Sequence, residues 1–288
     1  MKKLIFVMLI TFLLCGCTPA EEVNIVATTR PVYTFTQRLC SGTDLKVAQL
    51  VTENVSCLHD YTLKVEQMQL LEQADAVIIN GAGLEDFLED ALDSTDRIAD
   101  ASVGLSLLEG EHHNHDHHEG HTHEEDPHIW LSPKNAAVMA RNICESLCRL
   151  YPAHAQTFQV NLEVLLSDLD ALQTYGQEAL RDLSSRELIT FHDGFSYLAE
   201  SFDLMILMAV EEESGSEASA KQLISLITLV QEHQLPAIFT ETNGSVSAAG
   251  IISAETNVPI YTLDMGISGE DYFDMMYRNI NTLREALN

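Results

Sequence analysis

The chain is poor in basic residues: it has 15 lysines and arginines against 44 aspartates and glutamates, a formal net charge of -29. Such an acidic balance argues against nucleic acid or an anionic membrane surface as a partner, and it is compatible with a cationic ligand. The sequence also lacks a His-Glu-x-x-His helix and a Gly-x-Ser-x-Gly turn, patterns typical of zinc peptidases and serine hydrolases. We therefore expect a protein that is not an enzyme.

The N-terminus lacks an apolar run of about twenty residues, the length that a transmembrane helix needs. Lys2 and Lys3 precede a mainly apolar run of eleven residues, 4–14, and Cys15 and Gly16 then lead to Cys17. This order is typical of a secretory signal, and the Leu14-Cys15-Gly16-Cys17 ending resembles a bacterial lipobox. We expect residues 1–16 to be a signal peptide, Cys17 to carry a lipid, and residues 17–22 to form a tether. An ordinary signal peptide with chance cysteines is the alternative.

The remaining length of about 270 residues favours two lobes over one modest domain. Strand-like segments alternate with helical periodicity through both halves, which indicates α/β lobes with mainly parallel sheets. Between the halves, apolar residues recur at helical spacing over residues 152–183, which predicts one helix of about thirty residues, or about 45 Å. We expect an N-terminal lobe at 23–151, a linking helix at 152–184 and a C-terminal lobe at 185–288. The strands are expected at 23–29, 44–51, 74–80, 97–102, 187–191, 204–210, 237–240 and 259–263, and the other helices at 31–39, 64–73, 84–92, 133–150, 195–201, 218–234, 245–256 and 271–287.

Four cysteines remain after processing, at Cys40, Cys57, Cys144 and Cys148. An even count in an exported protein suggests disulfides, but two cysteines four residues apart on one helix rarely have the geometry to bridge each other. Pairing with Cys40 or Cys57 stays open. Cys57, two residues before a histidine, is either a soft metal ligand or, as we favour, a buried or unpaired thiol.

Histidine is concentrated in one segment, since residues 111–130 hold eight of the twelve histidines in the chain. Residues 111–125 have no apolar periodicity, so this loop should remain in solvent, where imidazoles and carboxylates can collect metal ions. An incidental solvated linker is the other interpretation. The accessory metal ligands would be His112, His113, His115, His117, His118, His121 and His123.

Other histidines lie where α/β proteins bind ligands. His59, His192 and Asp264 fall at or just beyond the carboxyl ends of expected strands, the edge at which open α/β sheets take ligands. His128 begins an ordered segment just after the histidine-rich loop. His154 and His233 lack such placement, and we interpret both as structural.

These features together resemble the solute-binding lipoproteins of ABC transporters that capture zinc or manganese. The resemblance covers essentially the whole mature chain, and its most specific part is the run Asp126-Pro127-His128-Ile129-Trp130-Leu131-Ser132-Pro133. It also rests on the lipobox, on His59-Asp60-Tyr61, on the strand before Glu85, on Phe191-His192-Asp193 and on Tyr261-Thr262-Leu263-Asp264. The resemblance implies two α/β lobes joined by a rigid helix, with one metal ion between them. The ligands it implies are His59 and His128 from the first lobe and His192 and Asp264 from the second.

The sequence departs from the family before the first ligand. Ser56, Cys57 and Leu58 precede His59, where the family usually has proline or a small acidic context. The loop that carries the first ligand is therefore expected to have a different shape.

Histidine at position 192 favours zinc over manganese, because zinc members of the family have histidine there and manganese members tend to have glutamate. Three imidazoles with one carboxylate or water also suit tetrahedral Zn²⁺, whereas Mn²⁺ prefers more oxygen ligands. We expect a monomer, anchored by lipid outside the cytoplasm, that passes Zn(II) to an ABC permease. A manganese-binding member of the family, a surface adhesin or zinc store, and a zinc hydrolase are the alternatives.

Overall fold

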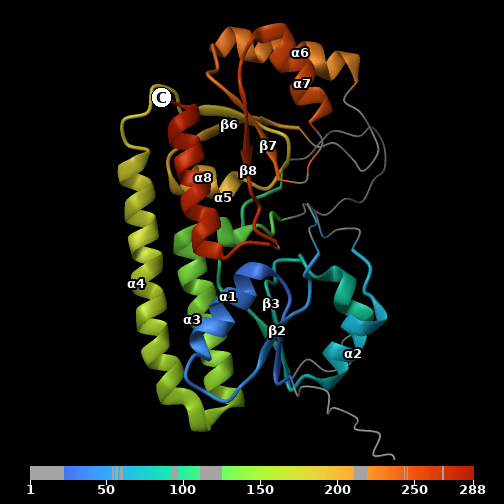
Figure 1. Ribbon diagram of the computed structural model, residues 1–288, viewed down its shortest axis with the longest axis vertical. Coiled ribbons are helices and arrows are strands. Elements are labelled where there is room, and N and C mark those ends of the chain that lie inside the picture. The colour runs from blue at the N-terminus through green and yellow to red at the C-terminus, as the bar shows by residue number, and fades with distance from the viewer. Residues whose placement is uncertain are drawn as a thin grey trace, which may run out of the picture.

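The computed structural model describes residues 23–288 except 54, 56–57, 59–60, 92–96, 111–124, 211–218, 243, 245 and 268. It contains two four-stranded, all-parallel sheets with the strand orders β2-β1-β3-β4 and β6-β5-β7-β8. The two halves of the chain thus repeat one topology, and the predicted fold class is confirmed. Figure 1 shows the second sheet above the first, with helices running along one side of both.

The first lobe alternates strands with helices, as parallel pairing requires. Its elements are β1 (Ile25–Ala27), α1 (Arg30–Leu39), β2 (Val47–Gln49), α2 (Val65–Gln73), β3 (Ala76–Ile79), a 3₁₀ helix (Asp86–Ala91), β4 (Ile98–Asp100), a short 3₁₀ turn (Ile129–Leu131) and α3 (Pro133–Leu150). Ser132 caps α3 by accepting a hydrogen bond from the Asn135 backbone N–H, and Pro133 occupies the first turn, so this helix begins where the sequence predicts.

The second lobe repeats the alternation. Its elements are β5 (Glu187–Thr190), α5 (Ser196–Ser201), β6 (Met205–Ala209), α6 (Ala220–His233), β7 (Ile238–Glu241), α7 (Ser247–Thr256), β8 (Ile260–Leu263) and α8 (Tyr272–Ala286). Strands β5, β6 and β8 are shorter than their predicted segments, whereas β7 has the predicted four residues and lies one position further along the chain. None of the helices in the part of the chain that the structure describes is long and apolar enough to cross a membrane.

The linking helix is shorter than predicted. A 3₁₀ turn (Pro152–His154) precedes α4 (Ala155–Ala179), whose 25 residues span about 37 Å. The guanidinium of Arg186 donates to the carbonyls of Leu180 and Arg181 at 2.9 Å each, which satisfies the acceptors where the helix ends. The apolar periodicity beyond residue 179 therefore does not continue as helix.

The prediction of an ordinary helix over 84–92 is wrong, because the structure has a 3₁₀ helix at Asp86–Ala91. Gly81, Ala82 and Gly83 all have positive φ angles, and the segment then closes with hydrogen bonds to the third preceding residue, such as Leu88 N–H to Glu85 carbonyl at 2.8 Å. That spacing makes a 3₁₀ helix. Gly81 is required here, since a Cβ at this position would lie 1.9 Å from Asp100 Oδ1.

One apolar core runs through both lobes along the helical side. It includes Phe35, Trp130, Leu169 and Met276, all fully buried, from the first lobe, α4 and α8. Helix α4 packs against α1 and α3 and also against α8, so it contacts both lobes. Because both lobes pack against α4 through this core, the core also sets the distance between the loops of the two lobes that face each other.

The cysteines that the structure describes are free thiols. Cys40, Cys144 and Cys148 form no disulfide, and Cys57 lies outside the described residues. Burial raises the pKa of the Cys40 thiol to about 12 and that of Cys144 to about 12, which keeps both protonated at neutral pH.

Candidate metal centre

His128 is fixed by the residue two places before it. Asp126 Oδ1 accepts the backbone N–H of His128 at 2.9 Å and also lies 2.8 Å from its ring Nδ1. Both side chains are 3% exposed, so this pair is shielded from solvent. A carboxylate on Nδ1 fixes the tautomer and leaves Nε2 as the nitrogen that can bind a metal.

The segment that carries His128 is anchored to the first sheet. The Asn80 side-chain amide, at the end of β3, donates to the Pro127 carbonyl at 3.0 Å. Asn80 is held in turn by Glu85, whose carboxylate accepts the backbone N–H groups of Asn80 and Gly81 and the Thr28 hydroxyl. Burial raises the pKa of Glu85 to about 7, against the opposing effect of these hydrogen bonds.

Trp130 ties the same segment to the second lobe. Its indole N–H donates to the Met265 carbonyl at 2.7 Å, and its own carbonyl accepts the Tyr272 hydroxyl at 2.9 Å. The ring is fully buried and lies 5.4 Å from the His128 ring between centroids. The single tryptophan of the chain therefore packs directly beside a predicted ligand.

His192 faces His128 from the second lobe. It follows β5, and the two imidazole centroids are 5.6 Å apart with planes at 83°. Its Nδ1 lies 3.6 Å from Oε2 of Glu241, at the end of β7. Gly194 allows the segment that follows His192 to lie against the His128 ring, because a Cβ at position 194 would be 3.0 Å from that ring and 2.2 Å from Met265 Cε.

Glu241 is buried beside two of the predicted ligands. Burial first, and the charge of Asp264 second, raise the pKa of Glu241 to about 8. Its Oε2 has no hydrogen-bond partner among the described residues, an unusual position for a buried carboxyl oxygen. A cation near this oxygen would compensate the buried, unpaired carboxyl group.

Asp264 lies at the edge of a cavity between the lobes. The cavity has a volume of about 410 Å³, and Val55 of the first lobe lines it together with Asp264, Thr262 and Arg278 of the second. The Asp264 carboxylate is already engaged: Oδ1 accepts the Gly266 N–H at 2.8 Å and Oδ2 accepts from Arg278 Nη2 at 2.8 Å.

The structure thus brings His128, His192 and, through Glu241, Asp264 to one region between the lobes. The predicted ligand His59 lies outside the described residues, as do Cys57, Cys17 and all seven accessory histidines of the 111–125 loop. Within the described ranges, no three His, Cys, Asp or Glu side chains are close enough to hold a metal ion. The histidines expected to be structural lie elsewhere: His154 pairs with Asp44 and His233 with Glu187.

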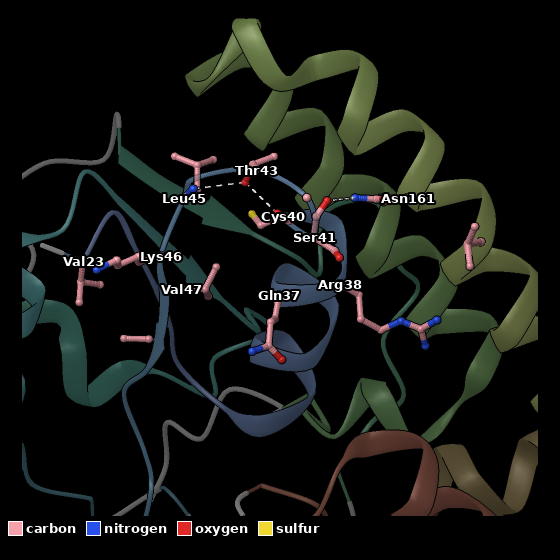
Figure 2. Close-up of a pocket in the computed structure, with 13 residues that line it drawn as sticks. Val23, Gln37, Arg38, Cys40, Ser41, Thr43, Leu45, Lys46, Val47 and Asn161 are labelled. Atoms are coloured by element: carbon pink, nitrogen blue, oxygen red, sulfur yellow. Dashed lines mark hydrogen bonds between the residues drawn. The ribbon is translucent and has the colours of Figure 1, made fainter. Parts of the chain in front are cut away.

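A second cavity lies in the first lobe, away from these residues. It has a volume of about 890 Å³ and is bordered by the α1–β2 connection and α4. Figure 2 shows Asn161 donating to the Ser41 carbonyl across it, and Thr43 closing the turn that follows α1. The described residues that line it include Arg38 and Lys46 but no histidine or carboxylate, and its one thiol, Cys40, is protonated at neutral pH, so the cavity offers a metal ion no favourable set of ligands.

Sequence reasoning missed three functional neighbours. The sequence marks Asp126 only as part of the motif around His128, and it gives Glu241 no role in the metal site. Arg278, on α8, gave no signal at all. Glu241 could have been found, because it ends a strand of the same sheet as His192 and Asp264 do.

A family model described as zinc-uptake complex component A, periplasmic (ZnuA), matches residues 25–286. Among curated proteins, a putative metal-binding protein of Treponema pallidum is 27% identical over 93% of this chain and 88% of its own length. The zinc-binding lipoprotein AdcA of Streptococcus pneumoniae is 29% identical over 99% of this chain, which spans only 61% of AdcA.

Solved structures agree with the fold. A ZnuA crystal structure superposes with a TM-score of 0.82 at 27% identity and covers 93% of this chain and 100% of its own. Zn(II)-bound AdcA from Streptococcus pneumoniae gives a TM-score of 0.78 at 27% identity, covering 93% of this chain and 58% of its own. A solute-binding protein from Pseudomonas aeruginosa in complex with Mn²⁺ also matches, with a TM-score of 0.76 at 24% identity, a likeness of fold alone.

Proposed function

The chain belongs to the zinc-uptake complex component A family, and from this premise we propose that it captures Zn²⁺ outside the cytoplasm and delivers it to an ABC permease. The observation that carries the proposal is the approach of His128 and His192 from opposite lobes, with ring centroids 5.6 Å apart. Each presents its Nδ1 toward a buried carboxylate, Asp126 or Glu241. Carboxylates placed behind imidazoles in this way support metal binding through the other ring nitrogen.

We propose a ligand set of His59, His128, His192 and Asp264, with the metal ion between the lobes. Three imidazoles and one carboxylate give the tetrahedral, nitrogen-rich environment that Zn²⁺ prefers over Mn²⁺. The names of the relatives ZnuA and AdcA favour the same metal. The buried Asp126 carboxyl group behind His128 offsets part of the cost of placing a dication in a region of low polarity.

The histidine-rich loop at 111–125 is proposed as an accessory collector. It immediately precedes the segment of His128, so zinc held there would be close to the main site. Ligands that must become ordered in order to chelate lose conformational entropy, so zinc bound by this loop should be held more weakly than zinc bound by ligands that the fold positions.

Lipid attachment at Cys17 would keep the monomer at the membrane beside its permease. The support is the lipobox-like sequence and the description of AdcA as a lipoprotein.

The test is metal analysis of the purified protein together with zinc titrations of His59→Ala, His128→Ala and His192→Ala. Trp130 is the single tryptophan and packs beside His128, so its fluorescence should report zinc binding without a label. Each variant should lose tight zinc binding, whereas His233→Ala, a surface histidine paired with Glu187, should keep it.

Metal preference is tested by competition titrations on the apoprotein at neutral pH. Zinc should displace manganese at equal concentrations. Manganese bound as tightly as zinc would contradict the assignment of the metal, and unchanged zinc affinity in His128→Ala would contradict the site itself.

A further inference from the structure

Asp264, the proposed fourth ligand, is held by two neighbouring residues of α8. Asn279 fixes its backbone, since the Asn279 amide accepts the Asp264 N–H at 2.9 Å and donates to the Asp264 carbonyl at 2.8 Å. Arg278, the preceding residue, donates from Nη2 to Asp264 Oδ2 at 2.8 Å. One turn of α8 therefore holds the Asp264 backbone through Asn279 and pairs the Asp264 carboxylate with Arg278.

The guanidinium of Arg278 is itself held in place by a second carboxylate. Its Nη1 pairs with Glu270, so Arg278 bridges two acidic side chains. All three residues line the 410 Å³ cavity between the lobes. The Asp264 side chain is 18% exposed and the Arg278 side chain is 44% exposed, so the carboxylate is largely covered and the guanidinium is partly open to solvent.

A metal ion and a guanidinium compete for one carboxylate. Both are cations, and their mutual repulsion at a shared ligand is strong where protein partly excludes water. The neighbouring Glu241 does little to offset this, since its own carboxyl is buried and adds negative charge only at the cost of desolvation. Metal coordination through Asp264 Oδ2 therefore competes directly with Arg278, whose partly exposed side chain can turn toward solvent.

We infer that Arg278 is a specificity-determining residue: it occupies Asp264 as an internal counter-ion and thereby disfavours cations that depend on oxygen ligands. The inference rests on the proposed function, because it concerns the fourth position of that site. Zinc can be held mainly by three imidazoles and loses little when Asp264 is engaged. Manganese depends more on carboxylate oxygen and loses more.

The experiment compares zinc and manganese affinities of wild type, Arg278→Gln, Asp264→Asn and the double variant. Arg278→Gln should raise manganese affinity about tenfold and zinc affinity by less than about threefold, as expected for removing a competing charge at a partly exposed site. Asp264→Asn should cancel the gain, so the double variant should show no improvement over Asp264→Asn alone. Arg284→Gln, an exposed arginine on the same helix, removes the same charge away from the cavity and should change neither affinity.

An unchanged zinc-to-manganese ratio in Arg278→Gln would overturn the inference, as would a gain that persists in the double variant. Thermal denaturation checks that Arg278→Gln remains folded, and Arg278→Ala repeats the test with a different side chain. Failure of the proposed function would be distinguished from failure of this inference by zinc binding to the wild type and to His128→Ala. If the proposed function fails, wild type itself binds no zinc, or binds it equally well after His128→Ala.

Discussion

Asp126→Asn tests whether the carboxylate behind His128 sets metal affinity. The substitution preserves shape, so the asparagine oxygen can still accept both His128 groups that Asp126 Oδ1 accepts, at 2.9 and 2.8 Å. The negative charge is lost, however, and a neutral hydrogen bond is about half as strong as a charge-assisted one. His128 becomes a poorer ligand, and zinc affinity should fall about 10- to 100-fold.

The same substitution should also affect folding. Asp126 Oδ2 has no hydrogen-bond partner among the described residues, and the new NH₂ group would take its place. Wild type already leaves one buried polar atom unpaired at this position, so the main loss is the weaker hydrogen bond to His128, and the free energy of unfolding in urea should fall by about 1 kcal/mol. Trp130 fluorescence of the metal-free variant should stay close to wild type, because the packing of the ring is unchanged.

Asp44→Asn is the matched control. Asp44 Oδ1 also lies near a histidine nitrogen, His154 Nε2 at 3.1 Å, but its side chain is 87% exposed. An exposed pair contributes little, so both zinc affinity and stability should stay close to wild type. The reasoning is refuted if a chelator-competition titration finds Asp126→Asn within about threefold of wild type, or if Asp44→Asn weakens zinc binding equally.

Three further outcomes are expected. Glu85 has a pKa of about 7 in the folded protein against 4.5 for the free side chain, so between these pH values the folded state binds more protons than the unfolded state. Its contribution to the free energy of unfolding is therefore fully present below pH 4.5 and is lost as the pH rises through 7. In urea titrations across this range, the wild type should lose up to about 3 kcal/mol relative to Glu85→Gln. Deleting residues 112–123 should leave one tight zinc site and remove only weaker ones in isothermal titration, and loss of the tight site would show that the loop supplies a primary ligand. Trp130→Phe loses the hydrogen bond to the Met265 carbonyl and should lower the free energy of unfolding by about 1 to 2 kcal/mol in urea titrations, with no change expected if that bond were made up by water.

The sequence by itself determined the fold class and most element positions. Alternating apolar periods predict parallel α/β lobes, and caps such as Ser132-Pro133 locate helix starts, because these signals act within a few residues of the chain. The same local signals placed His192 and Asp264 at strand ends. Helix ends and types were less predictable: Arg186 ends α4 by binding carbonyls, and the glycines before the Asp86–Ala91 segment set a 3₁₀ turn that apolar spacing alone does not reveal.

Only the tertiary structure decided which side chains meet. His128 and His192 lie far apart in the chain, and the shared core along α4 is what brings their rings to 5.6 Å. Arg278 has no local pattern that marks it. Glu241 is marked only by its place at a strand end, where a carboxylate is usually solvated. Their significance comes from burial and charge contributed by other elements: Asp264 beside Glu241, and Glu270 with Asp264 around Arg278. Sequence therefore specifies the candidates, while long-range packing specifies their neighbours and the charges against which a metal must compete.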